Sequence, residues 1–154
     1  MNMAAKRSSG LLRTFVGMLV TLIVSSGFAA ETGPHKVIDG VDVYYGVLPA
    51  AMVLEHLEEH SGAPSSESSH QLVVALFDAQ TKARIGEAQV RARVEQPGHL
   101  EVSEKKLEAM AIAGTITYGN YFEMSGKGPF LITVRLRTPS LPQEVEVIFE
   151  YRHF

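Results

Sequence analysis

The sequence predicts an all-β protein: a sandwich of two antiparallel sheets with about seven strands and one short helix. Residues 130–137 and 144–151 alternate apolar and polar side chains, which is the pattern of strands with one buried face. Turns that contain glycine or proline separate such segments at short, regular intervals. Together these features favour a sandwich of immunoglobulin type over a mixed α/β fold.

The first strand is expected within residues 37–48, where Val41, Val43 and Tyr45 alternate with polar or exposed positions. Pro49 follows, and proline is tolerated in the first turn of a helix.

A short helix is predicted near residues 50–60, because the segment AAMVLEHLEEH is rich in good helix formers. Gly62 is a plausible stop just after it. The serine-rich residues 61–69 have the composition of a flexible polar loop. The helix and the loop together form an insertion at about residues 49–69.

From residue 70 onward the pattern is that of strands. Residues 70–78 are apolar enough to be buried on both faces. Residues 85–95 alternate regularly and predict a half-buried strand. Residues 101–111 are ambiguous, since Leu107 and Met110 fit a helical turn as well as a short strand.

The remaining residues predict three more strands. Residues 115–124 form one, with a bulge or bend suggested by Gly119 and Asn120. The segment SGKGP, residues 125–129, is interpreted as a hairpin turn. The last two strands are expected to be antiparallel neighbours joined by a short loop.

Residues 1–29 have the features of a cleaved signal peptide. Three basic residues open the segment: Lys6, Arg7 and Arg13. An apolar run at 14–24 and small residues before Ala30 follow, so cleavage is expected after Ala29 or Ala30. The alternative is a membrane anchor, but the run is short for a spanning helix. The sequence therefore predicts export to the periplasm or an equivalent compartment.

The remaining residues, 30–154, are expected to form a single domain. Cleavage removes three of the 14 basic residues and none of the 17 acidic ones, which leaves a formal charge of −6. An acidic surface argues against nucleic-acid binding. There is no second apolar run long enough to enter a membrane after cleavage. Because the chain has no cysteine, any metal site must use His, Met, Asp or Glu.

Three segments resemble the YtkA-like family of small exported domains. They are HQLVVALFD at 70–78, ARIGEAQVRARV at 83–94 and YGNYFEMSGKGPFLITV at 118–134. The resemblance covers about residues 70–153. It implies an immunoglobulin-like sandwich outside the cytoplasmic membrane, and some relatives are linked to copper handling.

The first candidate metal site is on the predicted helix. Met52, His56 and His60 follow one another at i, i+4 spacing and would share one face. His70, beyond the serine loop, could fold back toward them. Thioether and imidazole ligands together suit copper better than zinc, whereas imidazole and carboxylate alone would accept zinc, nickel or copper. The alternative is that these histidines lie on a solvated acidic face, and Leu57 excludes the zinc-protease motif.

A second candidate combines Met110 and Met124 with His99 or His153. The alternative, favoured by the sequence, is that Met124 fills space in the core. His153 is next to the chain end, where disorder is common.

The sequence contains no nucleophile motif, so we expect no enzymatic activity. The predicted function is that of an exported accessory protein that binds copper or another transition metal. The alternative is an interaction module that docks on a membrane-associated partner through its sheet edges, without metal.

Overall fold

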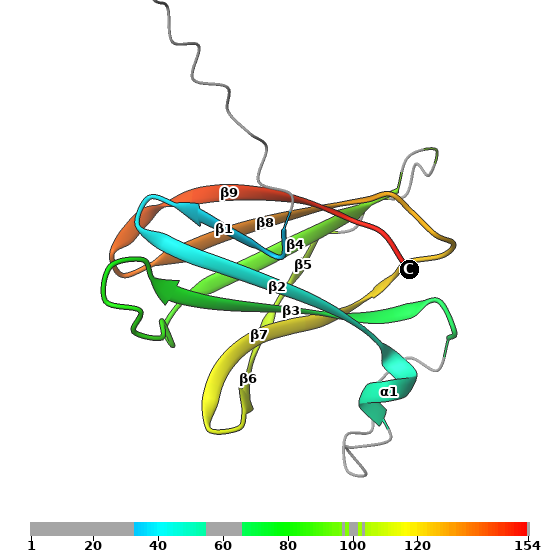
Figure 1. Ribbon diagram of the computed structural model, residues 1–154, viewed down its shortest axis with the longest axis horizontal. Helices are drawn as coiled ribbons and strands as arrows, with labels where there is room; N and C mark the ends of the chain where they lie inside the picture. Colours follow the sequence, from blue (N-terminus) through cyan, green and yellow to red (C-terminus); the bar gives the residue numbers. More distant parts are fainter. Residues whose placement is uncertain (1–32, 55–65, 97, 99–101, 103, 154) are drawn as a thin grey trace, which may run out of the picture.

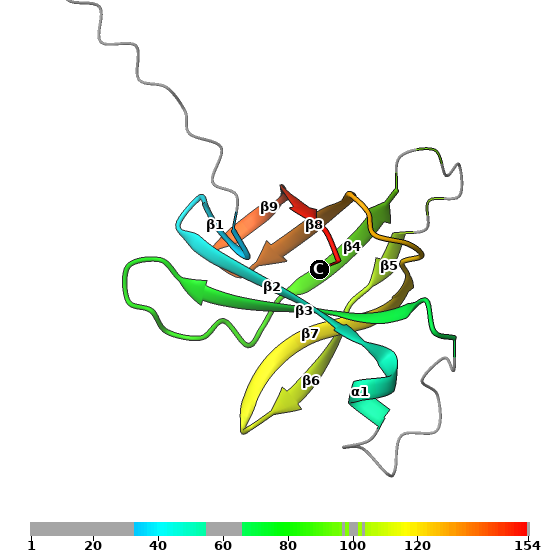
Figure 2. The same ribbon diagram turned by 45° about the vertical axis from the view of Figure 1, so that its right-hand side comes forward.

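The computed structural model describes residues 33–54, 66–96, 98, 102 and 104–153. These residues form two antiparallel sheets packed face to face, with one short helix at an end of the sandwich (Figures 1 and 2). The elements in chain order are β1 (His35–Ile38), β2 (Val41–Pro49), α1 (Ala50–Leu54), β3 (Ser69–Asp78), β4 (Gln89–Glu95), β5 (Glu104–Lys106), β6 (Glu108–Ile112), β7 (Thr115–Glu123), β8 (Phe130–Thr138) and β9 (Leu141–Tyr151). The predicted all-β sandwich is confirmed.

One sheet has five strands in the order β1-β2-β3-β7-β6, and the other has four in the order β5-β4-β8-β9. The alternation in the sequence places one apolar face of each sheet inside. Leu72, Val74 and Leu76 of β3 are fully buried there against Ile132 and Val134 of β8 and their neighbours. β8 and β9 are antiparallel neighbours, as predicted.

The single strand predicted at 37–48 is in fact a hairpin of β1 and β2. Asp39 and Gly40 both have positive φ angles, 46° and 82°. An Asp-Gly pair in this conformation is the preferred two-residue link between antiparallel strands. The hairpin register places His35 opposite Tyr44 and Val37 opposite Asp42.

The ambiguous segment 101–111 contributes strands rather than a helical turn. β5 and β6 are separated by Leu107, whose side chain is only 1% exposed. β5 pairs with β4 in one sheet and β6 pairs with β7 in the other, so the chain crosses between the sheets at this residue. The buried Leu107 anchors this crossing in the core.

The bulge considered at Gly119 and Asn120 is absent, and the hairpin turn expected at 125–129 is wrong. Gly119 causes no bulge: it pairs regularly with Val73 and Glu108. A Cβ atom there would overlap the Met110 methyl group and lie 3.1 Å from the Leu72 carbonyl oxygen, so the glycine allows close packing. Residues 125–129 are no hairpin turn, because they join β7 of one sheet to β8 of the other.

The predicted helix begins at Ala50, directly after β2. Residues 55–65, with the rest of that helix and most of the serine loop, lie outside the described part of the chain. Within the part that is described, no helix has the length and apolar character needed to span a membrane.

The open side of the sandwich lies between β9 and the β1–β2 hairpin. Lys36 donates from Nζ to the Ile148 carbonyl oxygen at 2.7 Å. Tyr45 donates from its hydroxyl to the Glu150 carbonyl oxygen at 3.2 Å. Both carbonyls belong to the free edge of β9, so these two side chains shield an edge that could otherwise pair with another strand.

Candidate functional site

The structure describes two of the four residues predicted as metal ligands. Met52 lies on α1 and is 60% exposed. His70 lies near the start of β3 and is only 8% exposed. His56 and His60 fall outside the described residues. The predicted group is therefore not tested as a set.

His70 instead meets two residues of the second candidate site, Met124 and His153, and we call these three residues the rim cluster. His70 pairs with Phe122 across β3 and β7, and Met124 follows the end of β7. The His70 and His153 rings are 4.5 Å apart between centroids and inclined by 36°. The cluster lies at the end of the sandwich, beside the β7–β8 connection, where β9 also ends (Figure 1).

Main-chain groups hold His70 and Met124 to a common point. The Ser68 carbonyl oxygen accepts hydrogen bonds from the Met124 backbone N–H at 2.8 Å and from His70 Nδ1 at 2.9 Å. Because a carbonyl can only accept, Nδ1 of His70 carries a proton. In the neutral ring Nε2 then has a free lone pair, and no described residue forms a hydrogen bond with it.

His153 is held by three hydrogen bonds. Its backbone N–H donates to the Lys127 carbonyl oxygen at 3.2 Å. Its ring donates from Nε2 to the Met124 carbonyl oxygen at 3.2 Å, and the Tyr151 hydroxyl lies 3.2 Å from Nδ1. The neutral ring is therefore protonated on Nε2, the opposite tautomer to that of His70.

The third member, Met124, is 1% exposed and supplies a thioether rather than a charge. The rim cluster lines a shallow pocket of about 380 Å³ together with Glu67, Ser68, Ser125 and Gly126. The Phe130 ring packs edge-on to His153, with 5.1 Å between centroids. Most of the side chains that line the pocket are therefore polar, and Met124 is the apolar one among them.

Glu123 adds a negative charge beside this opening. Its carboxylate accepts hydrogen bonds from the hydroxyl groups of Ser68 and of Ser66, the latter at 2.9 Å. These bonds, that of Ser68 first, hold the pKa of Glu123 below its ordinary value. The carboxylate therefore stays ionised near His70 and fixes the end of the serine loop against β7.

This donor set fits a soft transition metal better than a hard one. Two imidazoles and a thioether suit copper, whereas magnesium and calcium require oxygen ligands. Among the residues described, no three His, Asp or Glu side chains gather closely enough to hold a metal ion by themselves. The thioether is therefore the third potential ligand at the rim cluster.

Of the other members of the second candidate, Met110 does not join this cluster. Met110 lies on β6, where it packs over Gly119 and its sulfur accepts a hydrogen bond from Gln71 Nε2 at 3.6 Å. His99 lies outside the described residues. The expected burial of Met124 is confirmed. His153, which was expected to be disordered near the chain end, is instead held by hydrogen bonds.

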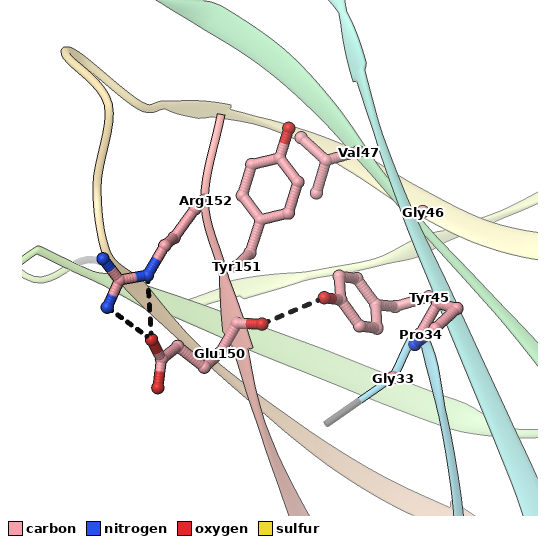
Figure 3. A pocket seen from close by; sticks show the side chains of 8 residues that line it. All are labelled: Gly33, Pro34, Tyr45, Gly46, Val47, Glu150, Tyr151 and Arg152. Atoms are coloured by element: carbon pink, nitrogen blue, oxygen red, sulfur yellow. Dashed lines mark hydrogen bonds and ion pairs between the residues drawn. The ribbon is translucent and has the colours of Figure 1, made fainter. Parts of the chain in front are cut away.

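A larger pocket of about 490 Å³ lies on the open side of the sandwich (Figure 3). It is lined mainly by apolar surface of Tyr45, Val47 and Tyr151, with the Glu150–Arg152 ion pair at its border. Tyr151 connects it to the rim cluster, because the same side chain reaches His153 with its hydroxyl.

Another histidine, His35, belongs to a different group, which we call the carboxylate cluster: His35, Asp42 and Lys82. The Asp42 side chain is 1% exposed. Its two oxygens lie 2.7 Å from Lys82 Nζ and 3.3 Å from His35 Nε2. The hydrogen bond from Lys82, more than that from His35, holds the pKa of Asp42 below its ordinary value.

Comparison with known proteins shows the fold alone. No family model matches the chain, and no curated relative matches its sequence. A DUF4426 family protein from Pseudomonas aeruginosa PAO1 has a similar structure, with a TM-score of 0.64, 16% identity, and coverage of 78% of this chain and 93% of that one.

Two copper-bound proteins also share the fold. A copper-bound variant of FetP from uropathogenic Escherichia coli matches with a TM-score of 0.63 and 13% identity, over 79% of this chain and 95% of that chain. A copper-bound variant of P19 from Campylobacter jejuni matches with a TM-score of 0.61 and 10% identity, over 79% and 95%. The chain therefore shares a small β-sandwich fold with proteins whose structures contain copper.

Proposed function

We propose that this chain is an exported, non-enzymatic accessory protein that binds copper at the rim cluster. The observation that carries the proposal is the meeting of two imidazoles and a thioether, from His70, His153 and Met124, at one pocket. A copper ion held there would have soft and borderline ligands in a partly apolar setting. The proposed chemistry is that of binding and transfer of the ion.

The structural neighbours support this proposal at the level of fold. FetP and P19 both bind copper in sandwiches of the same architecture. FetP was also obtained by expression in the periplasm. The signal-like residues 1–29 and the resemblance to the YtkA-like family point to the same compartment for this chain.

The predicted ligands on the helix remain part of the proposal as a second group. α1 starts directly after Pro49, and Pro49 pairs with His70 across β2 and β3. The helix that carries Met52 therefore begins beside the rim cluster. We propose that His56 and His60 extend the site, either by adding ligands or by delivering copper to it.

The test is a copper titration of the purified protein, with Cu(I) measured against a competing chelator and Cu(II) and Zn(II) measured by calorimetry. We expect one Cu(I) site, weakened by more than about 100-fold in His70→Ala and in His153→Ala. His35→Ala is the matched control, because that histidine faces Asp42 and should leave the affinity unchanged.

A protein that binds no Cu(I), or that binds it equally well without His70 and His153, would overturn the rim site. Loss of binding in a His56→Ala/His60→Ala variant alone would move the site to the helix. If no metal binds, a protein partner captured from membranes becomes the leading explanation. The shielding of the β9 edge by Lys36 and Tyr45 counts against docking at that edge.

A further inference from the structure

The free edges of the two sheets are not equally protected. On the open side of the sandwich, Lys36 of β1 and Tyr45 of β2 bond the carbonyls of β9 and shield its edge. The other side has the edge strands β5 and β6. All three residues of β5 are charged, and charged side chains on an edge hinder the addition of a further strand. β6 lies at the border of the five-stranded sheet (Figure 2) and has one charged residue among its five, Glu108. β6 is therefore less protected than β5 or β9.

The turn after β6 shows which of its main-chain groups are free. Residues 113–114 have positive φ angles, 49° and 76°, and form a two-residue link between β6 and β7. In such a hairpin the residues next to the turn form a hydrogen-bonded pair, and bonded and non-bonded pairs alternate from there. Ile112 thus bonds β7, whereas Ala109 and Ala111 direct their N–H and C=O groups away from β7, to the free edge.

The inner face of β6 borders a pocket between the two sheets. Ala109 pairs with Tyr118, which is 2% exposed, and cross-strand partners lie on the same face of a sheet. Both residues line a pocket of about 450 Å³, which we call the corner pocket. Its other polar side chains are those of Glu87, Gln89, Arg137 and Thr138. A strand added to β6 would carry the residue paired with Ala109 on this same inner face.

The polar groups of the corner pocket are not matched to one another. Within the described residues, Glu87 and Arg137 form no ion pair, and the buried Tyr118 hydroxyl forms no hydrogen bond. Burial raises the pKa of Tyr118, so its O–H stays protonated. The nearby Ala88 backbone N–H opposes this rise in part, but it can only donate and gives the O–H no acceptor. Buried polar groups normally have partners, so the pocket has the properties of a site that lacks its ligand.

We propose that an extended segment of a partner protein adds to β6 as an antiparallel strand and places an Asn or Gln side chain in the corner pocket. The main chain of the segment bonds Ala109 and Ala111, and the side chain opposite Ala109 provides specificity. The charges of Glu87 and Arg137 cancel, so the complementary group is neutral. A carboxamide donates through its NH₂ group and accepts through its oxygen, which matches one carboxylate and one guanidinium.

Charge complementarity favours such a segment over a second copy of this chain. The inward side chains of β6 itself are alanines, so a second β6 added here would leave Glu87 and Arg137 unmatched. The proposal is also independent of copper. Thr138 of the corner pocket ends β8, whereas Phe130 at the start of β8 contacts His153 of the rim cluster. The two sites thus lie at opposite ends of one strand.

The first experiment selects peptides of about seven residues from a random phage-displayed library on the purified protein. Ala111→Pro is the blocked variant, because proline lacks the N–H that Ala111 directs outward and is tolerated on an edge strand. Ala111→Val is the matched control, since it keeps this N–H. We expect peptides with Asn or Gln between β-branched residues to be enriched on the parent and on Ala111→Val but not on Ala111→Pro. Absence of this enrichment would overturn the proposal.

The second experiment compares one selected peptide with a form in which its Asn or Gln is replaced by the isosteric acid. Fluorescence anisotropy measures both affinities. The parent should bind the amide form at least about tenfold more tightly, because Glu87 repels an acid. Glu87→Gln leaves only the charge of Arg137 in the corner pocket, so the preference should reverse to the acid. An unchanged preference in Glu87→Gln would overturn the proposal.

The third experiment tests strand addition from the side of the peptide and does not depend on the folding of any variant. In an antiparallel pair, the residue opposite Ala109 bonds it through both its N–H and its C=O. N-methylation of the Asn or Gln should therefore weaken binding by more than about tenfold, and N-methylation of a flanking residue by less than about threefold. Equal losses, or the reverse pattern, would overturn the addition to β6.

Sedimentation of the parent and of Ala111→Pro tests the other occupant. A dimer that forms with rising concentration in the parent and is lost in Ala111→Pro would assign the edge to a second copy and overturn the proposal. A parent that stays monomeric at the concentrations that bind the peptide supports it. Cu(I) affinity should be equal in the parent and in Ala111→Pro, so failure of the copper site and failure of the peptide site are distinguishable.

Discussion

Two groups of polar side chains at opposite ends of β2 show how differently a histidine can be used in this sandwich. Near the start of the strand, His35 and Lys82 face the buried carboxylate of Asp42. Beyond its end, where Pro49 pairs with His70, the rim cluster contains no carboxylate among its three members. Ion pairs with Asp42 hold the first group together, whereas hydrogen bonds to main-chain carbonyl oxygens hold the second.

The difference determines which group can bind a cation. In the carboxylate cluster the Lys82 ammonium already lies 2.7 Å from Asp42, so the position of a cation is filled by the protein itself. In the rim cluster the Ser68 carbonyl accepts from Nδ1 of His70 and leaves Nε2 available. A matched set of charges stabilises the fold, whereas a set of neutral donors held by the backbone retains lone pairs for a ligand.

Substitution of the thioether is expected to affect metal binding more than any change at the carboxylate cluster and would sharpen this comparison. Met124→Leu removes the soft ligand while nearly conserving volume, so we expect Cu(I) binding to weaken by about 10- to 100-fold. The free energy of unfolding should change by less than about 1.5 kcal/mol. Chelator competition and chemical denaturation measure the two quantities.

Zn(II) affinity is the control for Met124→Leu. Because zinc prefers imidazole to thioether ligands, the Zn(II) affinity should change much less than the Cu(I) affinity. An unchanged Cu(I) affinity in this variant would mean that the thioether is only a core residue, as the sequence alone favoured.

The carboxylate cluster is tested by removing each partner of its ion pair in turn. Lys82→Met leaves the Asp42 carboxylate buried with His35 alone, whereas Asp42→Asn leaves Lys82, which is 66% exposed, in contact with water. Because an uncompensated buried charge is costly, we expect the lysine variant to be the less stable of the two. Thermal unfolding at neutral pH measures the order, and Cu(I) affinity should change in neither variant.

Equal stability of these two variants would indicate that His35 alone compensates the charge of Asp42. A change in Cu(I) affinity in either variant would break the comparison, because the two clusters would then be coupled through β2.

The smallest expected effect is the loss of stability at acid pH, to which the carboxylates of Asp42 and Glu123 both contribute. The folded-state pKa of Asp42 lies below its ordinary value of 3.8, and that of Glu123 lies below 4.5. Their contribution to stability is therefore complete above about pH 4.5 and is lost as the pH falls through the folded-state values. We expect a constant melting temperature from neutral pH to about pH 5 and a decline below pH 4.5.

The two carboxylates can be distinguished in the same experiment. Without Lys82 the pKa of Asp42 is no longer held down by its main partner, so Lys82→Met should lose less stability in acid than the parent. The gap between the two melting temperatures should narrow below pH 4. The Glu123→Gln variant measures how much of the acid-dependent loss of stability comes from Glu123. A difference between the melting temperatures of Lys82→Met and the parent that widens in acid would contradict the role of Lys82 in lowering the pKa of Asp42.

Much of the fold could be predicted from the sequence because alternation is a local property. In β4, for example, charged residues alternate with Val90, Ala92 and Val94. Such alternation within one strand predicts which of its faces is buried without information from the rest of the chain. The hairpin of β1 and β2 was missed although the Asp39-Gly40 pair carries a strong local signal, because the apolar run on both sides suggested one strand.

The candidate site was predicted only in pieces. His70 was expected to fold back toward the helix, while Met124 and His153 were weighed in a separate group with Met110. The Ser68 carbonyl oxygen accepts hydrogen bonds from the Met124 backbone N–H and from His70 Nδ1, and the Met124 carbonyl oxygen accepts one from His153 Nε2. Contacts of this kind follow no regular spacing in the sequence, since they depend on where the start of β3 and the ends of β7 and β9 lie in the fold.

The sequence by itself determined the all-β class, the alternating faces and the start of the helix, because propensity and period act over a few neighbouring residues. Only the tertiary structure decided that residues 125–129 cross from one sheet to the other, that Leu107 marks another crossing, and that the start of β3 meets the ends of β7 and β9 at one rim. The physical reason is that a strand joins the sheet in which its apolar face can be buried, and the apolar faces of the two sheets are buried only against each other. That requirement brings His70 and His153 into contact across 83 positions of the chain.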